Sequence, residues 1–198
     1  MGIDVLIIGA GPAGIFTALE LVKKNSHKSI TIVEKGASIE RRQCPKNVTG
    51  KCMNCKNCAI TMGFSGAGAF SDGKLSLSSD VGGDLPDLIG RELAEQTIDY
   101  TDKIYLEFGA DTHIEGLSNP QKVKEIRKKA IKAGLKLVDC PIRHMGTEKA
   151  RDIYYSIEKY LIDNGVQIIF DTPCIDLIIE NNVCKGAIVK KGKEEVSK

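Results

Sequence analysis

The sequence has almost no excess of charge of either sign, and this narrows the classes of partner. Its 198 residues carry 28 lysines and arginines against 26 aspartates and glutamates, which gives a formal net charge of +2 at pH 7. Proteins that bind nucleic acid or an anionic lipid surface through charge carry a clear excess of basic residues. We therefore expect neither a nucleic acid nor a membrane as a partner. The oligomeric state stays open.

Long hydrophobic runs are also missing. The apolar run Val5–Ile8 is too short for the core of a signal peptide, and no stretch has the length of a membrane-spanning helix. The seven cysteines are odd in number, which argues for thiols or bound metal in a reducing compartment and against a disulfide framework. We therefore expect a cytoplasmic protein, with a packed core because 42% of its residues are apolar.

A glycine-rich motif follows the first apolar run. Its sequence is GAGPAG, over Gly9–Gly14, between an expected strand at Ile3–Ile8 and an expected helix at Ile15–Lys24. A second expected strand, Ser29–Val33, leads directly into Glu34. Strand, glycines, helix, strand and acid in this order form the fingerprint of a dinucleotide-binding βαβ unit.

Each residue of the fingerprint has a physical role. Gly9 permits a tight turn off the strand, Gly11 lets a pyrophosphate approach the backbone, and Gly14 lets the helix pack closely on the sheet. Pro12 favours entry into the helix, whose amino-terminal N–H groups face the phosphates. The Glu34 carboxylate is placed to accept hydrogen bonds from the adenosine ribose, and it disfavours a 2′-phosphate. Both FAD and NAD fit this unit.

A second glycine-rich segment, residues 63–75, bears on the choice between FAD and NAD. It has four glycines and two serines in thirteen residues, a density typical of a backbone that approaches a ligand closely. A flexible linker is the alternative, but Phe64, Phe70 and Leu75 argue against it because such linkers seldom carry large apolar side chains.

These motifs together resemble the glutathione-reductase-type FAD superfamily, in which GxGPAG, a strand-end glutamate and a Gly/Ser-rich loop bind FAD. Within it, the sequence resembles the family of uncharacterised FAD-dependent dehydrogenases of the NAD(P)/FAD-dependent oxidoreductases. That resemblance rests on Arg41-Arg42-x-Cys44-Pro45, the closely spaced cysteines, GxGAFSDGKL and Arg143-His144-x-Gly146-Thr147.

The fingerprint and the resemblance together give the predicted FAD-binding residues: Gly9, Gly11, Pro12, Ala13, Gly14, Glu34, Lys35, Arg42, Gly66, Ala67, Gly68, Ser71, Asp72, Gly73, Cys174 and Ile175. Among them, Cys174 and Ile175 follow an expected strand at Val166–Phe170, and the resemblance implies that their backbone meets the adenine ring.

Two catalytic candidates are Lys74 and His144. Lys74 is a candidate for placing positive charge near the pyrimidine edge of the flavin, with an ordinary exposed lysine as the alternative. His144 is a candidate acid/base or a donor to a substrate carboxylate, with a histidine that satisfies local backbone groups as the alternative.

Four cysteines between the second strand and the glycine loop are candidate metal ligands. Cys44, Cys52, Cys55 and Cys58 have the spacing C-x7-C-x2-C-x2-C. An iron–sulfur cluster or a zinc ion would use such thiolates. A metal-free loop of reactive or packed thiols, and a Cys-x-x-Cys pair that exchanges electrons with the flavin, remain open.

We predict an α/β chain with a parallel sheet, a β-hairpin or meander formed by Ile175–Glu180 and Val183–Lys190, and an inserted helical region. The FAD-binding Rossmann-like domain is expected at 1–75 and 146–198. The insert is expected at 76–145, with helices at Asp87–Phe108 and Gln121–Ala133 and a strand at Leu135–Cys140. The resemblance also implies an amino-terminal fragment, because no strand that closes the FAD site follows before Lys198.

The predicted function is that of an FAD-dependent oxidoreductase that transfers a hydride from a small-molecule substrate to the flavin. Electrons would then pass to NAD(P) or to a protein acceptor. The alternative is a non-catalytic FAD-binding or redox-sensing module with a cysteine metal site. A nicotinamide-binding domain without flavin is a third possibility.

Overall fold

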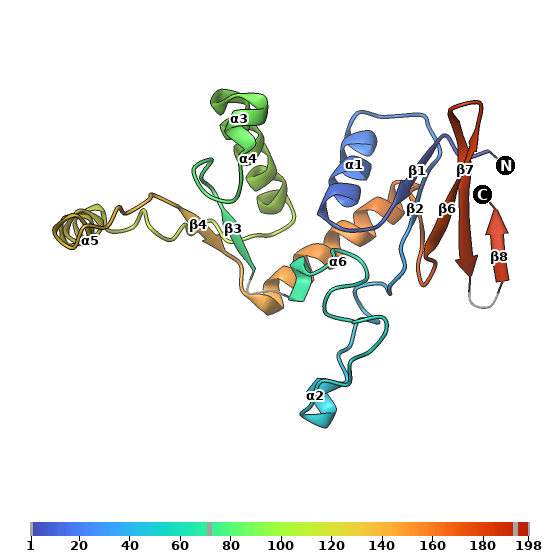
Figure 1. Cartoon of the computed structure of the whole chain (residues 1–198), viewed down its shortest axis with the longest axis horizontal. Coiled ribbons are helices and arrows are strands. Elements are labelled where there is room, and N and C mark those ends of the chain that lie inside the picture. Colours follow the sequence, from blue (N-terminus) through green and yellow to red (C-terminus); the bar gives the residue numbers. More distant parts are fainter. Residues whose placement is uncertain (1, 71–72, 192–193, 198) are drawn as a thin grey trace. The chain divides into compact units, whose positions relative to one another are not determined.

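The computed structural model describes residues 2–70, 73–191 and 194–197, and it forms two compact units (Figure 1). Unit 1 contains Met1–Phe70 and Tyr154–Lys198, and unit 2 contains Ser71–Ile153. The assignment of an FAD-binding role to 1–75 and 146–198, and of an insert to 76–145, stays a prediction.

A parallel sheet forms the centre of unit 1. It has the order β1 (Val5–Ile8), β2 (Ile30–Val33) and β5 (Gln167–Ile169), with parallel pairing throughout. All four residues of β2 are buried, as is typical of a central strand whose faces are both covered. The predicted parallel sheet and α/β class are therefore confirmed.

Two helices supply much of the apolar core of unit 1. Helix α1 (Pro12–Lys23) has proline in its first turn and buries Ile15, Ala18 and Leu19. Helix α6 (Thr147–Asp163) buries Ile157 and Leu161 in the part that belongs to unit 1. Both helices thus show the spacing of three to four residues that places apolar side chains on one face.

Three antiparallel strands complete unit 1: β6 (Cys174–Glu180), β7 (Val183–Lys191) and β8 (Glu194–Ser197). The β6–β7 turn is Asn181-Asn182, and both residues have positive φ, 50° and 61°. Asparagine tolerates this conformation, and two such residues match the twist of a tight hairpin. The predicted hairpin is confirmed. Two short helical segments, α2 (Lys46–Thr49) and η1 (Gly68–Phe70), lie in the loops that follow β2.

Unit 2 combines a two-stranded antiparallel sheet with helices. The sheet pairs β3 (Lys74–Ser76) with β4 (Ile142–His144), and the helices are α3 (Leu85–Ile89), α4 (Arg91–Glu107) and α5 (Pro120–Lys132). The helix expected at Asp87–Phe108 is divided, because Gly90 has a φ of 84° and interrupts it. The prediction of a strand at Leu135–Cys140 is wrong. The apolar residues of this segment lack a partner strand, and the pairing with β3 begins beyond Pro141.

A buried ion pair connects α4 to β4. Nε and Nη2 of Arg143 donate to the two carboxylate oxygens of Asp102 at 2.5 and 2.6 Å, and Nη1 donates to the carbonyl of Asp111. This hydrogen bonding raises the pKa of the Arg143 guanidinium. Because both charges are buried, removing either partner would leave the other uncompensated.

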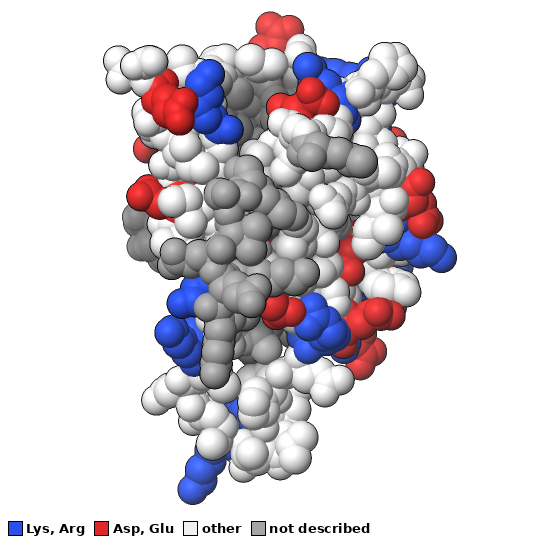
Figure 2. Space-filling model, turned by 90° about the vertical axis from the view of Figure 1, so that its right-hand side faces the viewer, with Lys and Arg blue, Asp and Glu red and all other residues white. Residues whose placement is uncertain are grey.

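The face of the molecule drawn in Figure 2 is mixed in charge. Figure 2 shows Lys and Arg side chains interspersed with Asp and Glu over the face in view, without a large area of one sign among the residues it colours. Among the described residues, no helix combines the length and apolarity needed to cross a membrane.

Glu158 makes the stability of unit 1 depend on pH. Its buried carboxylate accepts the backbone N–H of Ile39 at 3.0 Å, and burial raises its pKa above the ordinary value. A raised folded-state pKa means that the folded state binds the proton more tightly than the unfolded state. The contribution of Glu158 is therefore fully favourable below the unfolded-chain pKa of about 4.3, and it is lost as pH rises through the folded-state pKa.

We expect Glu158→Gln to flatten this dependence, because glutamine keeps the acceptor for Ile39 and carries no charge. The measurement is the free energy of unfolding from urea titrations between acid and neutral pH, as the difference between variant and wild type. Asp163→Asn, at an exposed acid of the same helix within unit 1, is the matched control. A difference that stays constant with pH would contradict the assignment.

Candidate functional site

The turn between β1 and α1 is shaped by two glycines in different ways. Gly9 has a φ of 96°, and its N–H donates to the Val33 carbonyl at 2.8 Å, which fixes the turn to the end of β2. A Cβ on Gly14 would lie 2.1 Å from the carbonyl oxygen of Gly9. Glycine is therefore required at 14 by the close packing of α1 on the turn.

Gly11 lies in a different environment. Its backbone is extended, with φ −76° and ψ 177°, and a Cβ there would have no atom within 4 Å. Neither conformation nor packing within the protein requires glycine at this position. The open space lies where α1 begins, and the first N–H groups of a helix have no acceptor within it. These are the features of a cradle for phosphate.

Glu34 links this turn to two other segments. One carboxylate oxygen, Oε2, accepts the N–H of Ala10 at 2.8 Å, and the other, Oε1, accepts those of Gly36 at 2.8 Å and Gly63 at 3.0 Å. The residue is 5% exposed. Three of about four lone-pair positions are thus occupied by backbone donors, and about one remains on Oε2. The ribose contact of Glu34 stays a prediction.

The second glycine-rich segment lies against the turn. The N–H of Ser65 donates to the Ala10 carbonyl at 2.7 Å, and a Cβ on Gly66 would lie 3.9 Å from the Cα of Gly11. Two segments that are far apart in the sequence therefore meet at the open space beside Gly11. The sequence predicted both segments for one site, and the structure places their backbones side by side.

The buried side chain of Arg42 orders the second glycine-rich segment and the residues just before it through hydrogen bonds to their backbone. Its guanidinium donates to three backbone carbonyls, those of Ala59 at 2.9 Å, Ile60 at 2.7 Å and Phe64 at 2.6 Å. It also lies over the ring of Phe70, 4.3 Å from the centroid. The residue is 1% exposed, and this burial lowers its pKa to about 10. Direct contact of Arg42 with a cofactor stays a prediction; the sequence pattern gave no sign of its role in ordering the loop.

The other predicted loop contacts fall in several places. Lys35 is exposed, Ala67 precedes the short helix η1, and Gly68 begins it. A Cβ on Gly68 would lie 2.8 Å from the hydroxyl oxygen of Tyr154, so packing alone favours glycine there. Ser71 and Asp72 lie outside the described residues, and Gly73 belongs to unit 2.

The segment before β6 is fixed to the end of β2. The N–H of Thr172 donates to the Glu34 carbonyl and that of Asp171 to the Gly36 carbonyl, both at 2.9 Å. Cys174 and Ile175 then begin β6, and Ile175 is exposed. Their backbone thus follows directly on a segment hydrogen-bonded beside Glu34, and their predicted adenine contact stays untested.

The two catalytic candidates meet within unit 2. Lys74 of β3 and His144 of β4 are directly opposite each other in the antiparallel register, so their side chains lie on the same face of the two-stranded sheet. Both residues are exposed. The sequence singled out each alone and did not predict their pairing, because the register depends on contacts across seventy residues.

The four candidate metal ligands are free thiols. Cys52 and Cys55 are exposed, and Cys44 and Cys58 are partly buried. Within the described ranges, no three or more His, Cys, Asp or Glu side chains are grouped so as to hold a metal ion. Hydrogen bonds from the backbone of Ile60 and from Thr61 lower the pKa of the Cys58 thiol, and the charge of Arg42 adds to this effect.

Comparisons with solved structures identify the fold. 3-Ketosteroid-Δ4-(5α)-dehydrogenase from Rhodococcus jostii RHA1 matches with a TM-score of 0.58 and 13% identity, over 98% of this chain and 43% of that one. Glycine oxidase from Geobacillus kaustophilus matches with a TM-score of 0.51 and 16% identity, over 98% and 53%. For L-amino acid deaminase from Proteus vulgaris the values are 0.50 and 17%, over 96% and 44%. The chain has the fold of these enzymes.

The chain spans about half the length of these proteins. No family model matches the sequence, and no curated protein matches it. At this level of identity the comparisons establish the fold, and they agree with the predicted Rossmann-type α/β architecture.

The two fingerprint glycines predict opposite effects on stability. Gly14→Ala places a Cβ against a backbone oxygen that cannot move aside, so we expect a loss of about 1–3 kcal/mol or more in the free energy of unfolding. Gly11→Ala places its Cβ in open space on an extended backbone, so a change within about 0.5 kcal/mol is expected. Urea unfolding of both variants measures this, and equal losses would contradict the described turn.

Proposed function

We propose that this chain provides the FAD-binding part of a flavin-dependent oxidoreductase that accepts a hydride from a small-molecule substrate. The observation that carries the proposal is the open cradle at Gly11, where the amino terminus of α1 meets the glycine-rich segment at Gly66. The shared fold supports it, because the similar structures are named as a dehydrogenase, an oxidase and a deaminase.

The residues of unit 1 fit the parts of FAD. The N–H groups of Ala13 and Gly14 would hold the pyrophosphate, and the absence of side chains at Gly11 and Gly66 admits it to the backbone. The remaining acceptor position of Glu34 would take a ribose hydroxyl. The segment at Cys174 would meet the adenine ring. Bound FAD supplies a two-electron acceptor for the hydride.

The catalytic roles belong to unit 2 in this proposal. Lys74 would place a positive charge near the reduced flavin, and His144 would move a proton or bind a substrate carboxylate. Lys74 and His144 are opposite each other in the β3–β4 pairing, and their side chains lie on one face of this sheet. This arrangement supports a shared role. We do not favour the alternative of a sensing module with a cysteine metal site, because the described thiols are not grouped as ligands.

Gly11→Ala tests flavin binding without disturbing the fold. We expect the wild-type protein to bind FAD and show the two flavin absorption bands, in the near ultraviolet and in the blue. The variant should bind at least about tenfold more weakly, or ~1.4 kcal/mol, because its Cβ occupies the phosphate cradle. Gly2→Ala, at a glycine that likewise has no atom within 4 Å of a built Cβ, is the matched control.

Two outcomes would contradict the proposal. If the protein shows no flavin bands after FAD has been added and unbound FAD has been removed, the protein does not bind FAD. A bound flavin that neither substrates nor nicotinamides reduce would replace the oxidoreductase with a non-catalytic flavin module.

NAD(P) as electron partner is a finer part of the proposal. Bleaching of the flavin bands by NADH or NADPH under anaerobic conditions would establish it. An iron–sulfur cluster or zinc at the four cysteines is not part of the proposal, and metal analysis of anaerobically purified protein tests this. We expect no stoichiometric metal, because the described thiols are not grouped as ligands. Iron or zinc at one equivalent would contradict this expectation.

A further inference from the structure

Unit 2 contains a cavity that flavin binding does not explain. Its volume is about 280 Å3, just below the range of roughly 300–1,000 Å3 that is usual for ligand pockets. One wall is a single face of α4, with residues at spacings of three and four. The lining residues are Leu77, Ser79, Glu95, Ile98, Asp99, Asp102, Ile114, Leu117 and Pro141.

Hydrogen bonds fix the walls opposite α4. The N–H of Leu77 donates to the Pro141 carbonyl at 2.9 Å, which ties the segment after β3 to the segment before β4. Glu115 and Ile142 exchange two backbone hydrogen bonds, at 2.8 and 3.1 Å, and this holds the loop that carries Ile114 and Leu117. The cavity is therefore formed by the backbone framework of unit 2 and is present before any ligand binds.

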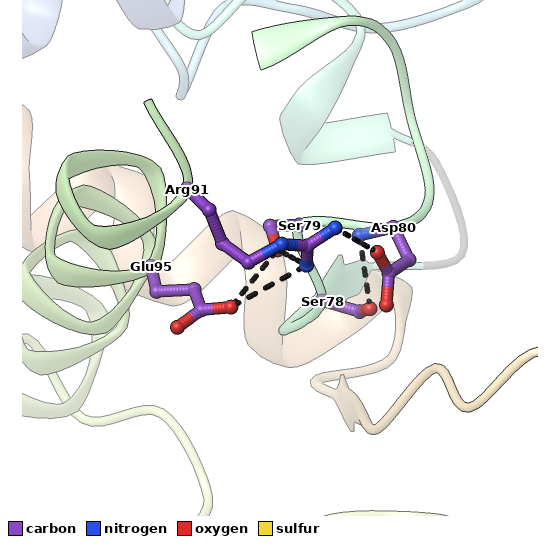
Figure 3. A network of polar contacts seen from close by, with 5 residues as sticks. All are labelled: Ser78, Ser79, Asp80, Arg91 and Glu95. Atoms are coloured by element: carbon purple, nitrogen blue, oxygen red, sulfur yellow. Dashed lines mark hydrogen bonds and ion pairs between the residues drawn. The ribbon is translucent and has the colours of Figure 1, made fainter. Parts of the chain in front are cut away.

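A polar network fixes the remaining wall (Figure 3). Arg91 donates to the carboxylate of Asp80 at 2.8 Å and to the hydroxyl of Ser79 at 3.1 Å, and Ser79 donates to Glu95 at 3.3 Å. The backbone N–H of Asp80 also donates to the hydroxyl of Ser78 at 3.2 Å. The network links Ser79, in the segment after β3, to Glu95 in α4, and both residues line the cavity.

The lining combines apolar surface with negative charge. Five of its nine residues are apolar, three carry carboxylates, and none carries a positive charge. Asp102 is neutralised by its buried pairing with Arg143. The exposed Glu95 and Asp99 pair with Arg91 and Lys103 through solvent-exposed contacts, and such pairs contribute little to stability. A cationic group on a ligand would therefore displace these partners at small cost.

We propose that this cavity binds small apolar amines, with the hydrocarbon part against Ile98 and Ile114 and the ammonium group near Glu95 and Asp99. Apolar walls supply the affinity, and the carboxylates select the charge, because an anion would meet like charges and a neutral ligand would lack the charge–charge attraction. The site belongs to unit 2 alone, so it does not depend on flavin binding.

The test uses three probes with the same cyclohexyl ring and a polar group of similar size, on protein with 13C-labelled isoleucine methyl groups: cyclohexylmethylamine, cyclohexylmethanol and cyclohexanecarboxylate. We expect the amine to shift the signals of Ile98 and Ile114 and to bind at least fivefold more tightly than the alcohol, while the carboxylate binds more weakly than both. The double variant Glu95→Gln, Asp99→Asn should remove the preference for the amine and leave the affinity for the alcohol unchanged.

The matched control is the double variant Asp87→Asn, Glu125→Gln, which removes the same charge from unit 2 at positions outside the cavity. It should keep the preference for the amine. The methyl spectrum of each variant shows at the same time that unit 2 is folded. Equal binding of the three probes, loss of the preference in the control, or no shift of Ile98 and Ile114 at about 10 mM amine, well above a 1 mM Kd, would each overturn the proposal.

Discussion

The carboxylate of Glu34 is the interaction on which the site of unit 1 depends. It accepts backbone N–H groups from the fingerprint turn, from Gly36 in the loop that follows β2 and from the second glycine-rich segment. A buried carboxylate is costly to desolvate unless its lone pairs are satisfied, so these loops are stable only in the arrangement that satisfies it. Hydrogen bonds to a charged acceptor are among the strongest available, which is why one side chain can order three segments.

Arg42 complements Glu34 in the second glycine-rich segment. Glu34 collects N–H donors, whereas Arg42 collects carbonyl acceptors, so the two buried charges together satisfy the backbone of a segment that has little regular secondary structure. The negative charge of Glu34 raises the pKa of Arg42 and so offsets part of the lowering that burial causes. A glycine-rich segment can thus have a defined shape without a helix or a strand of its own.

The sequence predicted best where one residue acts on its neighbours. The βαβ unit, the parallel sheet and the Asn181-Asn182 hairpin follow from local patterns, and the structure confirms them. It predicted poorly where the outcome depends on distant partners: the strand expected at Leu135–Cys140 lacks one, and the pairing of Lys74 with His144 needs a register that no local pattern fixes. Arg42 was recognised as part of a motif, but its contacts come from residues seventeen to twenty-eight positions away and carry no sequence signature.

Gly36 and Gly63 show a further consequence of this architecture. A Cβ on Gly36 would lie 2.4 Å from the nitrogen of Gly63, and one on Gly63 would lie 2.5 Å from the carbonyl oxygen of Ala37. The obstacle in both cases is main chain, which every amino acid shares, so no second substitution can make room for the first. At most positions in a protein core, a substitution by a larger residue can be compensated by a smaller residue at a neighbouring position. At these two it cannot, and we expect this part of the loop to change in evolution only through insertions or deletions that move whole stretches of backbone.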